Sequence, residues 1–176
     1  MSVADNVANW YAVHTRSNFE ARVATQLVAK GFEHYLPAYE ETRQWKDRRQ
    51  KINVPLFSGY VFARFHDTVE ERIRVLATTG VAAVLGCGGR LEPVREEELA
   101  AVRRLLDSRA VCMPYPYLKE GDWVRVRRGP LQGLEGYLVR FKGDARLVIS
   151  VSALAQSVAA ELDARDVEPA RRPAAV

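Results

Sequence analysis

The feature that most constrains this chain is an apolar run at Pro55–Phe65, with the sequence PLFSGYVFARF. Pro55 and Gly59 indicate a tight turn, and the residues after Gly59 are typical of a strand. Because side chains alternate along a strand, Tyr60 and Phe62 share one face of it. Both faces of this strand are apolar, so one packs on the core of its own domain and the other needs a second cover. That cover is either a helix of the same domain or a partner protein.

The segments around this run predict an α/β sandwich of about 100 residues, which is long enough to form its own core. Aromatic and β-branched residues indicate the strands, and apolar residues at helical spacing indicate the helices. The expected order is strand 10–14, helix 17–31, strand 32–36, hairpin or loop 39–54, strand 60–65, helix 68–80, strand 81–85 and helix 91–106.

Two of these helices carry the signature of a capping box, in which Ser or Thr precedes Glu by three residues. Ser17 and Glu20 form the pair at the first helix, and Thr68 and Glu71 form the pair at the second. The apolar residues expected to face inward from the second helix are Val69, Ile73 and Leu76.

The segment 39–54 is dominated by charge, and its five basic residues cannot all be buried. It is therefore expected to be a projecting hairpin or a mobile loop. The formal net charge of +4 favours an anionic partner for the chain. The alternative for this basic segment is a solvated surface without a partner. Its basic residues are Arg43, Lys46, Arg48, Arg49 and Lys51.

The pattern changes after Asp107, where two prolines and a loss of periodicity indicate a linker. Short strands separated by glycine turns follow and predict a small β-barrel. The predicted fold class is α+β, with an α/β sandwich at 9–107, a linker at 108–117, a β-barrel at 118–169 and a tail at 170–176.

Other classes of protein find little support in the sequence. No apolar run reaches the ~20 residues of a membrane helix, and no secretory signal is recognised, so a cytoplasmic protein is expected. Cys87 and Cys112 lack metal-ligand spacing. The three histidines are scattered and belong to no catalytic arrangement, so neither an enzyme nor a metal or cofactor site is predicted.

Two stretches of the chain resemble known domains. Residues 121–126 (GDWVRV) and 129–136 (GPLQGLEG), followed by an apolar strand, resemble a KOW domain, which is an SH3-like β-barrel. Residues 10–13 (WYAV) and 55–62 (PLFSGYVF) are similar to the NGN domain of the NusG family of transcription elongation factors. The resemblance covers about residues 9–169 with the two domains in the right order. The basic segment and short linker look more like specialised paralogues, such as RfaH-type or capsule-locus antiterminators.

The resemblance implies a transcription elongation or antitermination factor. Its NGN domain is expected to bind the clamp helices of the largest subunit of RNA polymerase and to suppress pausing or termination. By position, Tyr60, Phe62 and Phe57 are expected to bind the polymerase. The alternative is that Tyr60 and Phe62 are core residues. Upstream or non-template DNA is expected to meet the basic segment together with Arg16 and Arg22.

The resemblance also implies that the KOW domain recruits a second protein, either the termination factor Rho or a small-subunit ribosomal protein. Leu131, Leu134 and Leu154 are the expected contacts, with barrel core as the alternative. Some RfaH-type proteins refold this domain into a helical hairpin, but the many valines here favour strands. A monomer is expected. The alternative function is a ribosome-associated or RNA-binding KOW protein that uses Arg125, Arg127, Arg128 and Arg140.

Overall fold

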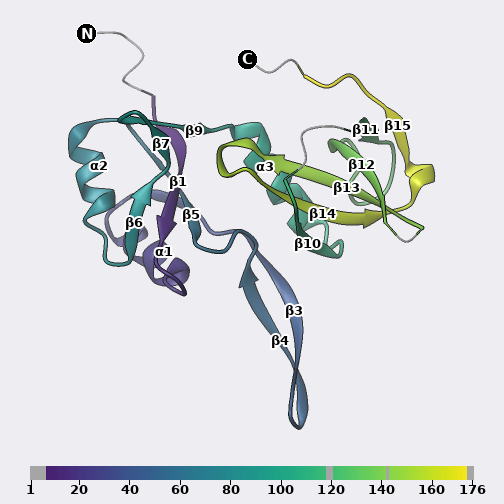
Figure 1. Ribbon diagram of the computed structural model, residues 1–176, viewed down its shortest axis with the longest axis horizontal. Coiled ribbons are helices and arrows are strands. Elements are labelled where there is room, and N and C mark those ends of the chain that lie inside the picture. The colour runs from purple at the N-terminus through teal and green to yellow at the C-terminus, as the bar shows by residue number, and fades with distance from the viewer. Residues whose placement is uncertain (1–6, 118–120, 142, 174–176) are drawn as a thin grey trace. The chain divides into compact units, whose positions relative to one another are not determined.

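The computed structural model describes residues 7–117, 121–141 and 143–173. These residues form two compact units, divided between Glu96 and Glu97, and each unit has its own antiparallel sheet (Figure 1). The fold class is α+β, in agreement with the sequence. The division falls at the start of a helix that the sequence analysis assigned to the first domain, whose end was expected at Asp107. The structure therefore puts nearly all of this helix in the second unit.

The first unit combines two helices, one five-stranded sheet and two separate hairpins. Its elements are β1 (Asn9–Thr15), α1 (Glu20–Ala29), β2 (Glu33–Tyr35), β3 (Ala38–Trp45), β4 (Arg48–Pro55), β5 (Tyr60–Phe65), α2 (Val69–Leu76), β6 (Val81–Val84), β7 (Gly86–Cys87), β8 (Arg90–Leu91) and β9 (Pro93–Val94). The sheet has the order β2-β5-β1-β6, and β9 also pairs with β1.

Strand β5, formed by the run that the sequence singled out, lies inside this sheet with β1 on one side and β2 on the other. The register with β1 sets Val61 opposite Val13 and Phe62 opposite Ala12. Val61 and Val13 belong to the core that the sheet shares with α1 and α2. Phe62 points to the other face because successive side chains alternate. The buried members of the helix-facing core are Tyr11, Val13, Val23, Ala24, Leu27, Phe32, Val61, Ala63, Phe65 and Val75.

Helix α2 begins as the sequence predicts but turns a different face inward. The Thr68 side chain accepts a hydrogen bond from the backbone N–H of Glu71 at 3.2 Å, as expected of its cap. The Glu71 carboxylate accepts a bond from the backbone N–H of His66 at 2.7 Å, which ties that side of the helix to the end of β5. Val75 is consequently the buried apolar residue of this helix. The residues expected to face inward are exposed instead, Val69 by 75%, Ile73 by 59% and Leu76 by 48%.

The capping box expected at the start of α1 does not form. Phe19 is the N-cap residue and its side chain makes no capping bond. Glu20 is nearly buried, and its carboxylate accepts a hydrogen bond from the backbone N–H of Gly59 at 2.8 Å. Gly59 has a φ of +81°, a conformation that favours glycine, and its carbonyl accepts the N–H of Thr15 at 2.8 Å. Glu20 therefore helps to hold the turn that leads into β5.

Replacing Glu20 by Ala is expected to lower the free energy of unfolding by about 1–3 kcal/mol, because a partly buried N–H loses its charged acceptor. Urea denaturation of the full-length protein measures this loss. Glu20→Gln keeps an acceptor oxygen of similar reach and serves as the control, with a smaller loss expected. Equal losses of unfolding free energy in the two variants would contradict the prediction that this hydrogen bond stabilises the turn.

The second unit contains a six-stranded sheet with the order β10-β14-β13-β12-β11-β15. Its elements are α3 (Glu96–Asp107, of which Glu96 lies before the division), β10 (Cys112–Tyr115), β11 (Asp122–Val126), β12 (Glu135–Phe141), β13 (Asp144–Val151), a 3-10 helix (Ser152–Leu154), β14 (Gln156–Leu162), a second 3-10 helix (Ala164–Asp166) and β15 (Val167–Pro169). The region expected to be strands is thus a sheet here and not a helical hairpin. The expected linker at 108–117 contains β10, which pairs with β14, so this part of it belongs to the sheet.

One apolar cluster of this sheet contains Tyr137, Val148 and Ala159, with Trp123 packed against it. The Trp123 and Tyr137 rings meet edge to face with centroids 5.0 Å apart. The Trp123 indole N–H donates to the Glu135 carboxylate at 3.1 Å. The motif Gly121–Val126 therefore supplies strand β11 of the sheet and the Trp123 ring that packs on the cluster. This double role explains why the motif is recognisable in the sequence.

Candidate functional site

The face of the first sheet that is turned away from α1 and α2 carries an aromatic cluster. The Phe62 ring lies 6.3 Å from the Tyr35 ring in a stacked arrangement and 5.9 Å from the Phe57 ring in an edge-to-face arrangement. The His14 and Tyr60 rings lie 5.2 Å apart at one end of the same face. Such aromatic pairs add to the stabilisation that burial alone provides. We call these five residues the aromatic face.

Accessibility divides the aromatic face into two parts. Phe57 and Phe62 are buried, with 1% and 0% of their surface exposed. Tyr60 and Tyr35 are partly exposed, and His14 is exposed. Of the three residues predicted to bind a partner here, Tyr60 is partly exposed and Phe57 and Phe62 are buried, and their contact with a partner stays a prediction. Sequence reasoning missed Tyr35 and His14, although antiparallel pairing with β5 places them beside Phe62 and Tyr60.

Phe62→Ala is expected to lower the free energy of unfolding by about 3–5 kcal/mol, because it leaves a cavity where a fully buried ring packs. Tyr60→Ala, at a partly exposed position of the same strand, is expected to lower it by about 1 kcal/mol. Urea denaturation of both variants compares the two. A loss below about 1 kcal/mol for Phe62→Ala would contradict its role in the core.

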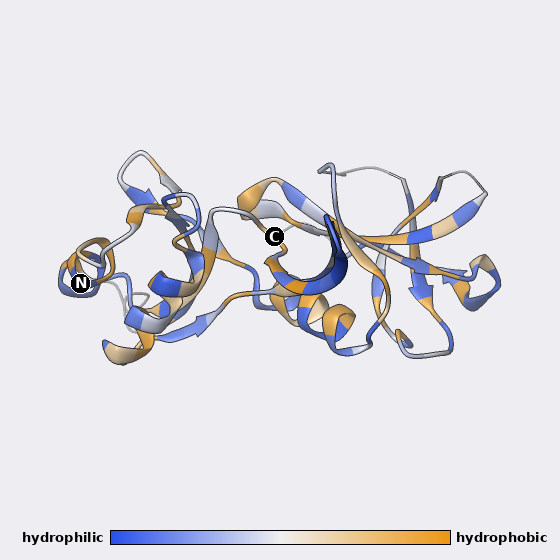
Figure 2. Ribbon diagram, turned by 90° about the horizontal axis from the view of Figure 1, so that it is seen from below, coloured by the Kyte–Doolittle hydropathy of each residue, from blue (hydrophilic) through white to orange (hydrophobic). Residues whose placement is uncertain are grey.

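The second candidate surface is the ribbon formed by β3 and β4, which extends away from the first sheet (Figure 1). The two strands pair from Ala38 opposite Pro55 to Trp45 opposite Arg48. Lys46 and Asp47 form the turn between them. Figure 2 looks along this ribbon from below, and its outer part is coloured as hydrophilic. The sequence left open whether this segment is a projecting hairpin or a mobile loop. The structure shows the hairpin.

Carboxylates neutralise part of the ribbon's positive charge near its base. Lys51 Nζ lies 2.7 Å from the Glu40 carboxylate, and Arg43 Nε lies 3.1 Å from the Glu41 carboxylate. Exposed pairs of this kind contribute little stability, but they reduce the net charge that a distant anion experiences. The sequence analysis treated the five cations as one patch. The structure leaves an excess of positive charge toward the tip, where Lys46, Arg48 and Arg49 accompany the one acid Asp47.

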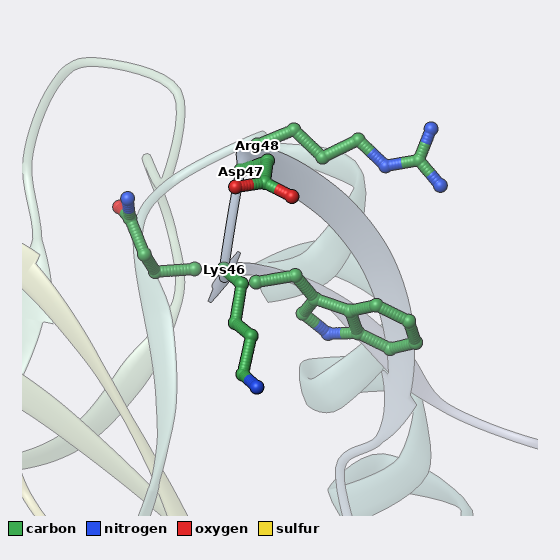
Figure 3. A pocket seen from close by; sticks show the side chains of 5 residues that line it. Lys46, Asp47 and Arg48 are labelled. Carbon is green, nitrogen blue, oxygen red and sulfur yellow. The ribbon is translucent and has the colours of Figure 1, made fainter.

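The tip of the ribbon surrounds a hollow of about 700 Å³ lined by Gln44, Trp45, Lys46, Asp47 and Arg48. Trp45 is 59% exposed, which is unusual for so large an apolar side chain. Figure 3 shows the Lys46 and Arg48 side chains leaving the turn in different directions. An exposed indole that precedes Lys46 in the chain and pairs opposite Arg48 can stack on an unpaired base while the cations meet phosphates.

Arg16 and Arg22 were predicted to join the ribbon in one basic surface. Arg16 follows β1, and its backbone N–H donates to the carbonyl of Gly80 at 2.8 Å. The Arg22 guanidinium lies over the Phe19 ring at 5.7 Å. Both arginines are exposed at the β1–α1 corner, and no hydrogen bond or ion pair joins either of them to the ribbon in the described part of the chain.

The three leucines predicted to recruit a partner lie in two loops of the second unit. Leu131 and Leu134 belong to the loop between β11 and β12, and Leu154 belongs to the 3-10 helix after β13. All three are buried, with 5%, 3% and 7% of their surface exposed. A partner therefore has no direct access to these side chains in the conformation observed.

Both leucine-bearing loops are hydrogen-bonded to helix α3. Near the start of the helix, the Glu98 carboxylate accepts bonds from the backbone N–H of Ser152 at 3.1 Å and from its hydroxyl at 2.7 Å. Toward its end, the Arg104 guanidinium donates to the carbonyl of Gln132 at 2.5 Å. These contacts link α3 to the strand-rich part of its own unit.

Two of the four arginines that the RNA-binding alternative requires are paired with acids. Arg125 and Arg128 lie 2.5 Å from the carboxylates of Glu135 and Asp166, respectively. Arg127 donates to the carbonyl of Arg165 at 3.4 Å. Arg140, the fourth arginine of the RNA-binding alternative, is exposed. Much of the charge that this alternative requires is therefore already engaged within the protein.

No cluster of three His, Cys, Asp or Glu side chains in the described segments is placed to hold a metal ion. No helix among the residues 7–117, 121–141 and 143–173 is long and apolar enough to cross a membrane.

The described chain thus consists of an α/β unit with a projecting ribbon and a second unit that combines helix α3 with a six-stranded sheet. A family model described as "Transcription termination factor nusG" matches residues 8–103, which is more than half of the chain. The chain belongs to the NusG family.

Relatives of known name span nearly the whole chain. It is 31% identical to the transcription termination/antitermination protein NusG of Deinococcus radiodurans, over 88% of this chain and 95% of that protein. It is 28% identical to the protein of the same name from Halalkalibacterium halodurans, over 91% and 97% of the two chains. The solved structure of NusG from Thermotoga maritima covers 93% of this chain and 98% of its own, at 21% identity and a TM-score of 0.56, which supports the fold. The chain is thus a member of a family of transcription termination and antitermination proteins.

Proposed function

We propose that this protein is a transcription elongation factor that binds RNA polymerase across its cleft through the first unit and suppresses pausing or termination. The observation that carries the proposal is the family match over residues 8–103, which includes every element of the first unit. The clamp helices of the largest polymerase subunit are the proposed contact. This function places the protein in the cytoplasm, where the polymerase is. Membership of a specialised, RfaH-type branch stays a prediction.

The accessible end of the aromatic face supports a polymerase contact there. The Tyr60 and His14 rings lie 5.2 Å apart in a tilted arrangement with part of their surface free, and Tyr35 is partly exposed on the neighbouring strand. Partly exposed aromatic residues on a rigid sheet are typical centres of protein interfaces. Phe62 packs against the Tyr35 ring and against Phe57, so the two phenylalanines help to fix the position of Tyr35.

Tyr60→Ala is expected to weaken binding to purified core RNA polymerase by more than tenfold, because a central aromatic residue of an interface contributes 2 kcal/mol or more. Co-purification and fluorescence anisotropy of labelled full-length protein measure this loss. Ile73→Ala, which removes an exposed apolar side chain from α2, is the matched control and is expected to bind normally. Normal binding by Tyr60→Ala would remove Tyr60 from the interface. Absence of binding by the unaltered protein would refute the proposed function.

We also propose that the tip of the ribbon meets the upstream or non-template DNA at the polymerase. The concentration of Lys46, Arg48 and Arg49 beside an exposed Trp45 supports an unpaired strand as the ligand. Arg16 and Arg22 stand apart from the tip, so any contact they make is proposed as a separate one. Phosphate contacts of this kind confer affinity without sequence preference.

Lys46→Gln/Arg48→Gln is expected to lower the affinity of the full-length protein for a single-stranded DNA oligonucleotide and to reduce the slope of log K against log salt by about one to two. Arg43→Gln/Lys51→Gln removes the same charge from the acid-paired part of the ribbon and is the matched control. Fluorescence anisotropy at several salt concentrations gives both slopes. Equal slopes for the two double variants would refute a contact centred on the tip.

The second unit is proposed to recruit another protein, either Rho or a small-subunit ribosomal protein, through its leucine-bearing loops. Attachment to the polymerase raises the effective concentration of this unit near its partner. The first unit itself changes pausing only as far as it binds the active polymerase more tightly than the paused one. The RNA-binding alternative has less support, because Arg125 and Arg128 are already paired with acids.

A further inference from the structure

The sheet of the second unit has a face turned away from α3. Cys112 of β10 lies on the α3 side, because its thiol is 3.8 Å from the carbonyl of Leu105. Met113, the next residue, points to the opposite face because side chains alternate along a strand. We call this opposite face the outer face. One apolar row crosses it from strand to strand, with Met113 opposite Ala159, Ala159 opposite Val148, Val148 opposite Tyr137 and Tyr137 opposite Trp123.

This row is apolar where the outer face of an antiparallel sheet commonly carries polar side chains. Its three middle residues are buried, whereas its two ends, in β10 and β11, are partly exposed. Polar pairs flank it on both sides. Arg146 and Glu161 lie 3.5 Å apart on one side, and the hydroxyls of Ser150 and Ser157 lie 2.7 Å apart on the other. An apolar strip bordered by polar groups has the composition of a binding surface.

The chain itself covers the Trp123 end of the row with residues 170–173, which we call the strap. The strap follows β15, which pairs with β11. The backbone N–H of Ala170 donates to the carbonyl of Trp123 at 3.0 Å. Two residues further on, the Arg172 guanidinium lies over the Tyr137 ring, 5.4 Å from its centroid. The strap therefore crosses the aromatic end of the row and places an arginine on its ring.

Two local features of the sequence favour this contact. Gly121 has no side chain, and a Cβ at this position would lie 3.6 Å from the Tyr137 ring, so glycine keeps space beside that ring. Pro173 follows Arg172, and a residue before proline avoids helical backbone angles. Arg172 is thereby kept in an extended segment that can lie across the sheet.

The strap is bound weakly. Arg172 and Pro173 are exposed, and a cation over an aromatic ring at an exposed site contributes only modestly to binding. The strap stays in place because it belongs to the same chain, which raises its effective concentration at the row. An equivalent segment of another protein replaces it by matching this local concentration or by making further contacts with the row.

We propose that Trp123, Tyr137 and the adjoining row form a docking site for an extended Arg-Pro segment of a partner protein, and that the strap occupies this site until such a segment displaces it. The strap shows the chemistry of the ligand, which is an extended backbone bonded to the Trp123 carbonyl and an arginine on Tyr137. Extended segments that contain proline recur as ligands of aromatic surfaces. The site goes beyond the proposed function, because the outer face is turned away from α3, whose side chains contact the leucine-bearing loops.

Full-length Arg172→Ala tests the site, because it removes the guanidinium from Tyr137 and leaves the sheet unaltered. The probe is a synthetic peptide with the sequence of residues 167–173, VEPARRP. The indole N–H of Trp123, one of three tryptophans in the chain, reports binding in proton–nitrogen NMR spectra. The peptide is expected to bind Arg172→Ala about tenfold more tightly than the unaltered protein, whose own strap competes for the site.

Matched controls come from the neighbouring arginine. Arg171→Ala in the protein keeps the Arg172 contact, so the peptide is expected to bind this variant as weakly as it binds the unaltered protein. In the peptide, Arg172→Ala is expected to abolish binding to the Arg172→Ala protein, whereas Arg171→Ala is not. The two substituted peptides have the same net charge.

Three outcomes would refute the proposal. The first is an unchanged Trp123 signal when Arg172→Ala meets the peptide at millimolar concentration. The second is equal peptide affinity of Arg172→Ala and the unaltered protein, because the strap would then not occupy the site. The third is equal binding of the two substituted peptides, because net charge, and not an arginine on Tyr137, would then cause the attraction.

Discussion

The antiparallel pairing of β1 with β5 is the interaction on which the first unit depends. It sets Val61 among the side chains that α1 and α2 cover, and it sets Phe62 on the opposite face beside Tyr35. Both faces of β5 are then filled by large apolar side chains, and such burial is the main source of stability in a domain of this size. The Glu20 carboxylate fixes the turn that begins this strand. Tyr60, the first residue of β5, is thereby held rigidly at the accessible end of the face, and rigidity of this kind lowers the entropy lost on binding.

Stability does not explain the composition of the ribbon. A two-stranded hairpin without a core behind it is marginally stable alone, and here it is joined to the sheet at its base, where Leu56 N–H donates to the carbonyl of Pro37. Two cations in the middle of the ribbon form ion pairs with Glu40 and Glu41, whereas Lys46, Arg48 and Arg49 at the tip outnumber Asp47, and Trp45 is also exposed there. The exposed apolar surface and the excess positive charge at the tip of the ribbon are not needed for folding. A binding function explains both.

The sequence predicted those elements whose signals are local. Gly59 and the alternation after it located β5, and the Thr68 cap located α2. It failed where long-range contacts decided between local options. Glu20 fits a capping box by spacing, but its carboxylate serves Gly59, which is 39 residues away in the chain. The inward face of α2 was misjudged because a two-turn helix has too few residues for its periodicity to exclude a rotation, and the bond from His66 to Glu71 selected the rotation.

For α3 the sequence predicted a helix at 91–106, which overlaps the observed Glu96–Asp107, but it did not predict which loops the side chains of this helix contact. Amphipathic periodicity states that a helix has an apolar face and leaves open which surface that face covers. Glu98 and Arg104 add that information, since each reaches a backbone group in a separate loop. Charged side chains at two points fix the register of a helix on a surface more specifically than apolar contacts do, while contributing little to the strength of attachment.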